Sequence, residues 1–258
     1  MFIYACAMNE LSFDERQKLE IDFWKNNKQE GAGVISLEGM VNKFSEFEIF
    51  FNEINIHESL FTKSHSILEI GGGSLWASCF LKKKFLDKEI YGSDISPEAI
   101  NCSDTWESVF NVSLDKKLCL DVAKKFEKGL HVDLIFCYAS AHHFIDFEST
   151  LKNLRLMLNK QGAIIFLHEP LSNRVFYKFA KRRVNQKRPE VYEDLLRPHV
   201  LKKAALTNEL DIDIKIHPST LNRKGVASVY YYLLSRIKFL NKILPTSVCV
   251  VFLLKNNG

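Results

Sequence analysis

The sequence has little of what defines disulfide-rich or metal-binding small domains. Its six cysteines are scattered along 258 residues, without a CxxC pair or another spacing typical of paired ligands. Their positions are Cys6, Cys79, Cys102, Cys119, Cys137 and Cys249. Three of them fall in strand-like runs, so we expect reduced core thiols and no structural metal site.

Long hydrophobic runs and a strong charge of one sign are missing too. No apolar run approaches the ~20 residues that span a bilayer, and the apolar opening lacks the cationic lead of a signal peptide. We therefore expect a cytoplasmic protein without stable membrane insertion. The net charge of +4 does not indicate a nucleic-acid binder. What the chain does have is 47% apolar residues and 20 Phe, enough for a sizeable core.

Hydrophobic periodicity predicts two helices and then an alternation of strands and helices. The helical stretches, at about 10–30 and 38–62, form an expected N-terminal helical cap over residues 1–63. The expected second domain covers residues 64–258. Its strands are expected at 66–70, 89–93, 117–121, 132–138, 163–169, 212–217 and 248–254, with helices near 75–85, 96–110, 122–128 and 147–159. This alternation predicts a doubly wound α/β fold with a parallel sheet, whose ligands bind beyond the carboxyl ends of the strands.

The interval 171–208 interrupts this alternation with a basic segment. Its length predicts a helical insertion after the fifth strand, near the ligand-binding end of the sheet. It holds ten Lys or Arg against three acids, a local balance of +7. The cations are Arg174, Lys178, Lys181, Arg182, Arg183, Lys187, Arg188, Arg197, Lys202 and Lys203. Two interpretations stay open: a solvated helical face, or a lid that recognises a phosphate.

A glycine turn follows the first predicted strand and defines the expected ligand site. Glu69 closes the strand, and Gly71, Gly72 and Gly73 follow almost at once. Glycines let the backbone approach a ligand closely, while the Glu69 carboxylate suits a cationic or hydroxylated group. The dinucleotide pattern GxGxxG fails here, because Trp76 stands at its last glycine position. A carboxylate beside the turn would also repel a pyrophosphate.

Two further acidic residues end the next two predicted strands. Asp94 stands where a carboxylate accepts both hydroxyls of a ribose in dinucleotide-binding folds. Asp121 can accept from an adenine amine, and the amide of Val122 can pair with a ring nitrogen. Taken in order, these positions predict a pocket for an adenosine joined to a positively charged amino acid.

Five segments of the chain resemble motifs of the class I S-adenosylmethionine (SAM)-dependent methyltransferases. The resemblance covers about residues 64–170, and the terminal strands extend it. It implies a Rossmann-like seven-stranded sheet in the order 3-2-1-4-5-7-6, with the last strand antiparallel. The segments are Leu68–Gly73, Tyr91–Pro97, Leu120–Ala123, Asp133–Phe144 and Asn159–Pro170.

The same resemblance implies SAM as the cofactor and names the residues that bind it. Glu69 and the glycine loop would hold the amino-acid end, Asp94 the ribose, and Asp121 with Val122 the adenine. The family often carries another glycine where this chain has Leu75, so we expect Leu75 to narrow the space beside the methionine moiety. The complete predicted set is Glu69, Gly71, Gly72, Gly73, Asp94, Ile95, Asp121, Val122 and Tyr138.

The catalytic candidates lie beyond the fourth and fifth predicted strands. Methyl transfer from a sulfonium depends mainly on alignment of the acceptor, and a hydroxyl acceptor also benefits from a general base. His142 and His143 follow the fourth strand, beside the expected methyl group, and His168 with Glu169 ends the fifth. We take His142, His143 and Glu169 as the catalytic candidates.

The resulting hypothesis is a methyltransferase that acts on a small molecule. The expected acceptor is a hydroxyl of a sugar, polysaccharide or natural-product intermediate, with an acidic or phosphate group that the basic insertion contacts. An RNA methyltransferase is one alternative, disfavoured by the modest charge and by the lack of an Asn-Pro-Pro-Tyr-like motif after the fourth strand. A non-catalytic interaction protein with a SAM fold is the other. The sequence does not determine the acceptor or the oligomeric state.

Overall fold

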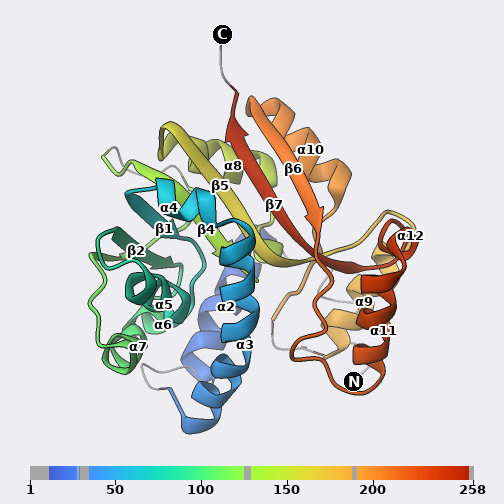
Figure 1. Ribbon diagram of the computed structural model, residues 1–258, viewed down its shortest axis with the longest axis horizontal. Helices are drawn as coiled ribbons and strands as arrows, with labels where there is room; N and C mark the ends of the chain where they lie inside the picture. The colour runs from blue at the N-terminus through green and yellow to red at the C-terminus, as the bar shows by residue number, and fades with distance from the viewer. Residues whose placement is uncertain (1–11, 28, 30–34, 125–128, 188–190, 256–258) are drawn as a thin grey trace.

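A computed structural model describes residues 12–27, 29, 35–124, 129–187 and 191–255. One mixed sheet crosses the middle of the molecule, with helices on both of its faces (Figure 1). Residues 1–11 and 30–34, the ends of the predicted N-terminal cap, lie outside the described residues, as do 125–128 and 188–190.

Within the described residues the sheet has seven strands in the order β3-β2-β1-β4-β5-β7-β6. Strand β7 is antiparallel to both of its neighbours, and the other pairings are parallel. The predicted order is therefore confirmed. The strands are β1 (Ser66–Glu69), β2 (Glu89–Asp94), β3 (Lys116–Cys119), β4 (Val132–Tyr138), β5 (Leu158–Leu171), β6 (Leu210–Ile216) and β7 (Thr246–Leu254).

Among the residues that the structure describes, three helices precede the sheet: α2 (Phe13–Asn26), α3 (Leu37–Ile56) and α4 (Glu58–Lys63). A reciprocal capping box begins α2, because the Ser12 hydroxyl accepts from the Glu15 amide while the Glu15 carboxylate accepts from the Ser12 amide. At 20 residues α3 is the longest described helix, and it carries several acids. None of the described helices combines the length and the apolar character needed to span a membrane.

The helices that follow β1 agree only in part with the predicted ones. Those between the first five strands are α5 (Trp76–Lys84), α6 (Pro97–Asn101), α7 (Ser103–Phe110), a 3-10 turn at Ala141–His143, and α8 (Phe147–Leu156). The helix expected at 122–128 is wrong for its described part, since residues 122–124 form a turn. The insertion contains α9 (Tyr177–Lys187) and α10 (Pro198–Thr207). Helices α11 (Val226–Arg236) and α12 (Lys238–Asn241), before β7, were not expected.

Two hydrophobic cores hold the helices against the sheet. One joins α8 and α10 to one face, through residues such as Leu154 and Leu201. The other joins α3, α5 and α7 to the opposite face and contains the fully buried Phe50 and Trp106. Burial of each such side chain contributes about 1.5–3 kcal/mol to the stability of the fold. The two cores together cover both faces of the strands. The buried faces fix the strand ends that carry the site.

Candidate functional site

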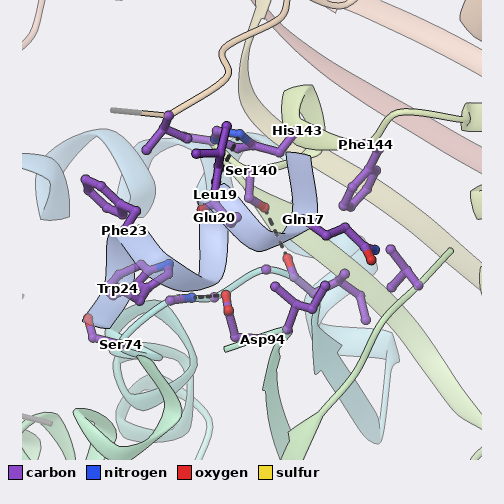
Figure 2. A pocket seen from close by; sticks show the side chains of 18 of the residues that line it. Gln17, Leu19, Glu20, Phe23, Trp24, Ser74, Asp94, Ser140, His143 and Phe144 are labelled. Atoms are coloured by element: carbon purple, nitrogen blue, oxygen red, sulfur yellow. Dashed lines mark hydrogen bonds and ion pairs between the residues drawn. The ribbon is translucent and has the colours of Figure 1, made fainter. Parts of the chain in front are cut away.

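A cavity of about 780 Å³ opens at the carboxyl ends of β1, β2 and β4. Its floor is the loop after β1, and helix α2 crosses over it, so that Gln17, Glu20 and Trp24 face the strand ends (Figure 2). This is where ligands bind in open α/β sheets. All nine of the predicted cofactor residues line this one cavity.

Two of the three glycines are required by the backbone of this loop. Gly71 has φ +67° and Gly73 has φ +55°, values that glycine adopts without the penalty of a Cβ. A Cβ on Gly71 would lie 3.0 Å from Ser140 Oγ, and one on Gly73 would lie 2.6 Å from Trp24. Larger residues would therefore push the loop away from both β4 and α2.

Leu75 also adopts a left-handed conformation, with φ +59°. The turn into α5 needs this backbone geometry, which glycine adopts without the penalty of a Cβ. The Leu75 side chain is fully buried and does not line the cavity, and a Cβ on Gly92 would lie 2.7 Å from its Cδ1. The expectation that Leu75 narrows the ligand space is therefore wrong, because the side chain points into the core beneath β2.

Glu69 ends β1 with a carboxylate that is almost completely buried. Its Oε2 accepts hydrogen bonds from the amide of Ser78, at 3.1 Å, and from the Ser78 hydroxyl. Burial raises the pKa of Glu69 to about 7, and the nearby Asp94 adds to the effect. A cationic ligand group in this cavity would therefore stabilise the ionised form of a carboxylate that the empty site disfavours.

Asp94 connects the glycine loop to the end of β2. Its Oδ2 accepts from the Gly73 amide at 2.8 Å, and its Oδ1 accepts from the Ser96 amide at 2.9 Å. Burial raises the pKa of Asp94 to about 6. Each carboxylate oxygen keeps a further lone pair, so Asp94 can accept from ligand hydroxyls while it holds the loop. Ile95, the next residue, lines the same wall.

Asp121 lies beyond the end of β3, which stops at Cys119. Its Oδ1 accepts from the Ala123 amide at 3.0 Å and from the side-chain amide of Gln17 at 2.9 Å. The predicted strand end at 121 was therefore two residues too long. Asp121 and Val122 still line the cavity, opposite the glycine loop.

Helix α2 supplies site residues that the sequence reasoning missed. Gln17, Glu20 and Trp24 stand three and four positions apart, which places them on one side of the helix. Gln17 contacts Asp121, and Trp24 packs against Gly73. Glu20 Oε2 lies 3.6 Å from His143 Nδ1. Helix α2 therefore lines the cavity with residues from several of its turns. The polar residues Gln17 and Glu20 on this side of an amphipathic helix were the sequence signal that could have indicated its part in the site.

Tyr138 ends β4 and lines the cavity with its ring. It packs edge-on against Trp76, with centroids 5.4 Å apart, and stacks on His168 at 5.9 Å. Its hydroxyl is buried without a hydrogen-bond partner among the described residues. Burial raises the pKa of this phenol well above its ordinary value. Tyr138 is therefore a neutral wall residue.

His142 and Glu169 form a buried pair that does not line the cavity. The Glu169 carboxylate accepts from the amides of Ser140 and Ala141 at 2.8 Å each, and His142 Nδ1 lies 2.8 Å from its Oε2. His142 Nε2 is 2.9 Å from Glu193 Oε2. Burial by itself lowers the pKa of His142, but the two carboxylates outweigh it and raise the pKa to about 10. This geometry suits a pair that fixes the turn after β4.

His143 is the one of the three catalytic candidates that lines the cavity. Its side chain is 25% exposed, and its Nδ1 lies 3.2 Å from the Tyr192 carbonyl oxygen. Its neighbours in the cavity wall include two carboxylates, Glu20 at 3.6 Å and Glu193 at 4.0 Å. His143 is thus placed to exchange a proton with a bound molecule.

The insertion reaches the cavity with Val191, Tyr192 and Glu193. Among the described residues, none of its cations lines the cavity, and Arg182 and Arg183 are exposed on α9. Two other cations, Arg16 and Lys43, do line it, from α2 and α3. The insertion therefore adds one negative charge to the cavity wall and no positive one within the part of the chain that the structure describes.

The fold and this arrangement of strand ends define the class I methyltransferase architecture. A family model described as a methyltransferase domain matches residues 68–164. Methionine S-methyltransferase from Arabidopsis thaliana is 30% identical over 91 residues, which are 31% of this chain and 8% of that enzyme. The chain thus matches only a small part of this relative. Residues 68–164 are therefore similar to a methyltransferase domain, and the described fold is the one that class I methyltransferases share.

Solved structures with the same fold come from natural-product methyltransferases. The plantazolicin methyltransferase BpumL, in complex with a pentazolic desmethylPZN analogue and S-adenosylhomocysteine (SAH), aligns over 95% of this chain and 98% of its own, at 15% identity and a TM-score of 0.59. An O-methyltransferase from a trans-AT polyketide synthase of Brevibacillus brevis, in complex with SAH, aligns over 84% and 76%, at 12% identity and a TM-score of 0.55. At these identities the similarity establishes the fold.

Proposed function

We propose that this protein is a SAM-dependent methyltransferase of a small-molecule acceptor. The observation that carries the proposal is the convergence of Glu69, Asp94 and Asp121 on one cavity, around a loop whose glycines take left-handed conformations. Three acceptors in this order suit an ammonium group, a ribose and an adenine amine. A dinucleotide would instead bring a pyrophosphate next to Glu69.

The predicted cofactor residues have distinct roles in this proposal. Glu69 and the loop amides hold the amino-acid end of SAM, Asp94 holds the ribose hydroxyls, and Asp121 with the Val122 amide holds the adenine. Ile95 and Tyr138 form apolar walls. Gln17 already donates an amide hydrogen to Asp121 at 2.9 Å, the kind of bond that an adenine amine would make. Helix α2 therefore has to yield locally when the adenine enters.

The chemistry requires little covalent work from the protein. Bound SAM would supply an activated methyl group, which the acceptor oxygen would take while the carbon–sulfur electron pair stayed on sulfur, leaving SAH. The hydroxyl proton passes to a base, for which we propose His143, the candidate that lines the cavity. Glu20, 3.6 Å from the ring, would stabilise the imidazolium that forms. We propose that His142 and Glu169 act indirectly, by positioning the turn that carries His143.

The charges in the cavity wall bear on the acceptor. Two carboxylates, Glu20 and Glu193, lie within 4.0 Å of the His143 ring. A phosphorylated or acidic acceptor beside the His143 ring would meet these carboxylates; the described cations of the insertion do not line the cavity, and Arg16 and Lys43, which do line it, come from α2 and α3. We therefore propose that the acceptor is a neutral hydroxyl of a sugar, polysaccharide or natural-product intermediate. We no longer propose that the acceptor carries a phosphate group.

A labelling screen tests this proposal. The protein is incubated with SAM carrying a deuterated methyl group and with matched sets of hydroxylated, phosphorylated and amine-bearing metabolites, followed by mass spectrometry. We expect transfer to hydroxylated compounds, strongly reduced in His143→Ala. Transfer to phosphorylated compounds alone would contradict the acceptor argument. SAH binding without transfer to any set would favour the non-catalytic interpretation.

A further inference from the structure

A second group of ionisable side chains lies behind the cavity, between α3 and the β5–β7 half of the sheet. Glu53 comes from α3, His57 directly follows that helix, and Cys249 lies on β7. His217 follows β6, and His168 lies near the end of β5. None of these five residues lines the cavity described above. The group is therefore separate from the proposed catalytic site.

Three of these side chains offer ligand atoms to a common point. The donor atoms of Glu53, His57 and Cys249 all lie within 4.8 Å of one another. All three residues are buried: Glu53 is 0% exposed, Cys249 1% and His57 5%. The Cys249 thiol contacts Glu53 Oε2 directly, and His217 Nδ1 lies 2.8 Å from Glu53 Oε1. His217 Nδ1 is therefore a fourth potential ligand atom, next to the Glu53 carboxylate.

Two buried imidazole nitrogens here have no hydrogen-bond partner among the described residues. They are His57 Nε2 and His168 Nδ1, the latter 3.9 Å from Glu53 Oε1. A buried polar atom without a partner costs about 1–3 kcal/mol, so native proteins rarely retain two of them side by side. A hydrogen-bonded ion pair between Glu53 and His217 accounts for the carboxylate but leaves His57 unexplained. A cation bound among these side chains would account for the carboxylate and would also give His57 Nε2 a partner, while His168 Nδ1 stays outside the ligand set.

We propose that Glu53, His57, Cys249 and His217 bind a zinc-class divalent ion. Thiolate, imidazole and carboxylate ligands in four-coordinate sites are typical of zinc. Zinc–ligand bonds of about 2.0–2.3 Å place neighbouring tetrahedral donors about 3.3–3.8 Å apart, so Glu53, His57 and Cys249, whose donor atoms lie within 4.8 Å of one another, need only small shifts, and His217 has to move off Glu53 to complete the set. The thiol proton leaves Cys249 for the solvent when the ion binds.

The expected role of this ion is structural. It ties the end of α3 to β7 and to the segment after β6, beneath Tyr138 of the cavity wall. Four protein ligands leave no open coordination position for a substrate. The ligands come from α3, β6 and β7, nearly 200 residues apart at the extremes, which is why no metal-binding spacing is present in the sequence. The sequence-based expectation of reduced core thiols and no structural metal site therefore does not extend to Cys249 in this proposal.

Metal content and cobalt spectroscopy test the site without any activity measurement. The full chain is purified without chelators and without a polyhistidine tag, and its zinc is measured by mass spectrometry. We expect about one zinc ion per chain. After the metal is removed, titration with Co²⁺ should produce the intense near-ultraviolet band of a thiolate–cobalt bond. Both signals should be lost in Cys249→Ala and strongly reduced in His57→Gln.

Cys79→Ala is the matched control. Cys79 is also fully buried, but it lies on α5, away from this group, so its loss removes a core thiol without removing a ligand. Retained zinc in Cys79→Ala beside its loss in Cys249→Ala supports the site. A wild-type chain that holds no zinc and gives no thiolate–cobalt band overturns it, even if the variants fail to fold. Equal loss in both alanine variants overturns it too. SAH binding, measured separately, keeps this result independent of the proposed function.

Discussion

Asp94 offers the sharpest perturbation of the proposed cofactor site. We expect Asp94→Ala to weaken SAH binding by about 10- to 100-fold. A hydrogen bond to a charged acceptor contributes about 1.5–3 kcal/mol, and each 1.4 kcal/mol is a factor of ten in affinity. Loss of one ribose bond therefore gives the lower end of this range, and loss of a second, or loosening of the loop, moves the effect upward.

The loop contributes because Asp94 also holds it. The carboxylate accepts from the Gly73 amide at 2.8 Å and from the Ser96 amide at 2.9 Å, and alanine leaves both donors without this partner. Asp94→Asn separates the two effects. It keeps the size of the side chain and one acceptor oxygen, so we expect a weakening that lies between wild type and alanine.

Isothermal titration calorimetry with SAH measures both variants, and thermal unfolding confirms that they are folded. Asp104→Ala is the control, since Asp104 is an exposed aspartate on α7 whose ion pair is with Lys117. It should bind SAH like wild type. A folded Asp94→Ala with an unchanged dissociation constant would refute the ribose assignment.

Three further predictions concern the loop, the insertion and pH. Leu75→Gly should lower the free energy of unfolding by about 0–4 kcal/mol, since the cavity cost of about 2–5 kcal/mol is at least as large as the ~1–2 kcal/mol of left-handed strain that the change relieves; a more stable variant in thermal unfolding would contradict this. Joint replacement of Arg182 and Arg183 by Ala should leave SAH affinity and the acceptor KM unchanged, and a raised KM would restore the lid hypothesis. SAM affinity should fall as the pH drops below about 7, by up to about tenfold per pH unit for each carboxylate and so up to about a hundredfold per unit well below pH 6, because the pKa values of Glu69, about 7, and Asp94, about 6, are raised in the empty site and the ligand selects the ionised forms; a flat profile from calorimetry would contradict it.

The sheet and the cofactor side of the cavity were predictable because their signals are local in sequence. A buried strand that ends in Glu69 and breaks into glycines specifies both a strand and a turn within nine residues. The alternation of strands and helices then restricts the topology to a few arrangements, and the resemblance selected the observed one. The helix expected near 122–128 followed from the strand–helix alternation, and its described part, residues 122–124, is a turn and bend instead.

The acceptor side was not predictable, because it depends on packing between distant segments. Gln17 reaches Asp121 across 104 residues, and His142 is held by Glu193 of the insertion. No periodicity indicates that the insertion presents a carboxylate to the cavity and leaves Arg182 and Arg183 exposed on α9. The conformation of Leu75 was equally hidden, since the side chain alone does not indicate that its backbone is left-handed.

The most direct test of the central claim is a comparison of SAM, SAH and NAD⁺ binding to the same preparation by calorimetry. In the proposed assignment Glu69 accepts from an ammonium group and Asp94 and Asp121 accept from an adenosine, while a pyrophosphate would meet the Glu69 carboxylate. We therefore predict saturable binding of SAM and SAH at one site per chain, abolished or weakened in Asp94→Ala, and no measurable binding of NAD⁺. Binding of NAD⁺ more tightly than SAM would contradict the account.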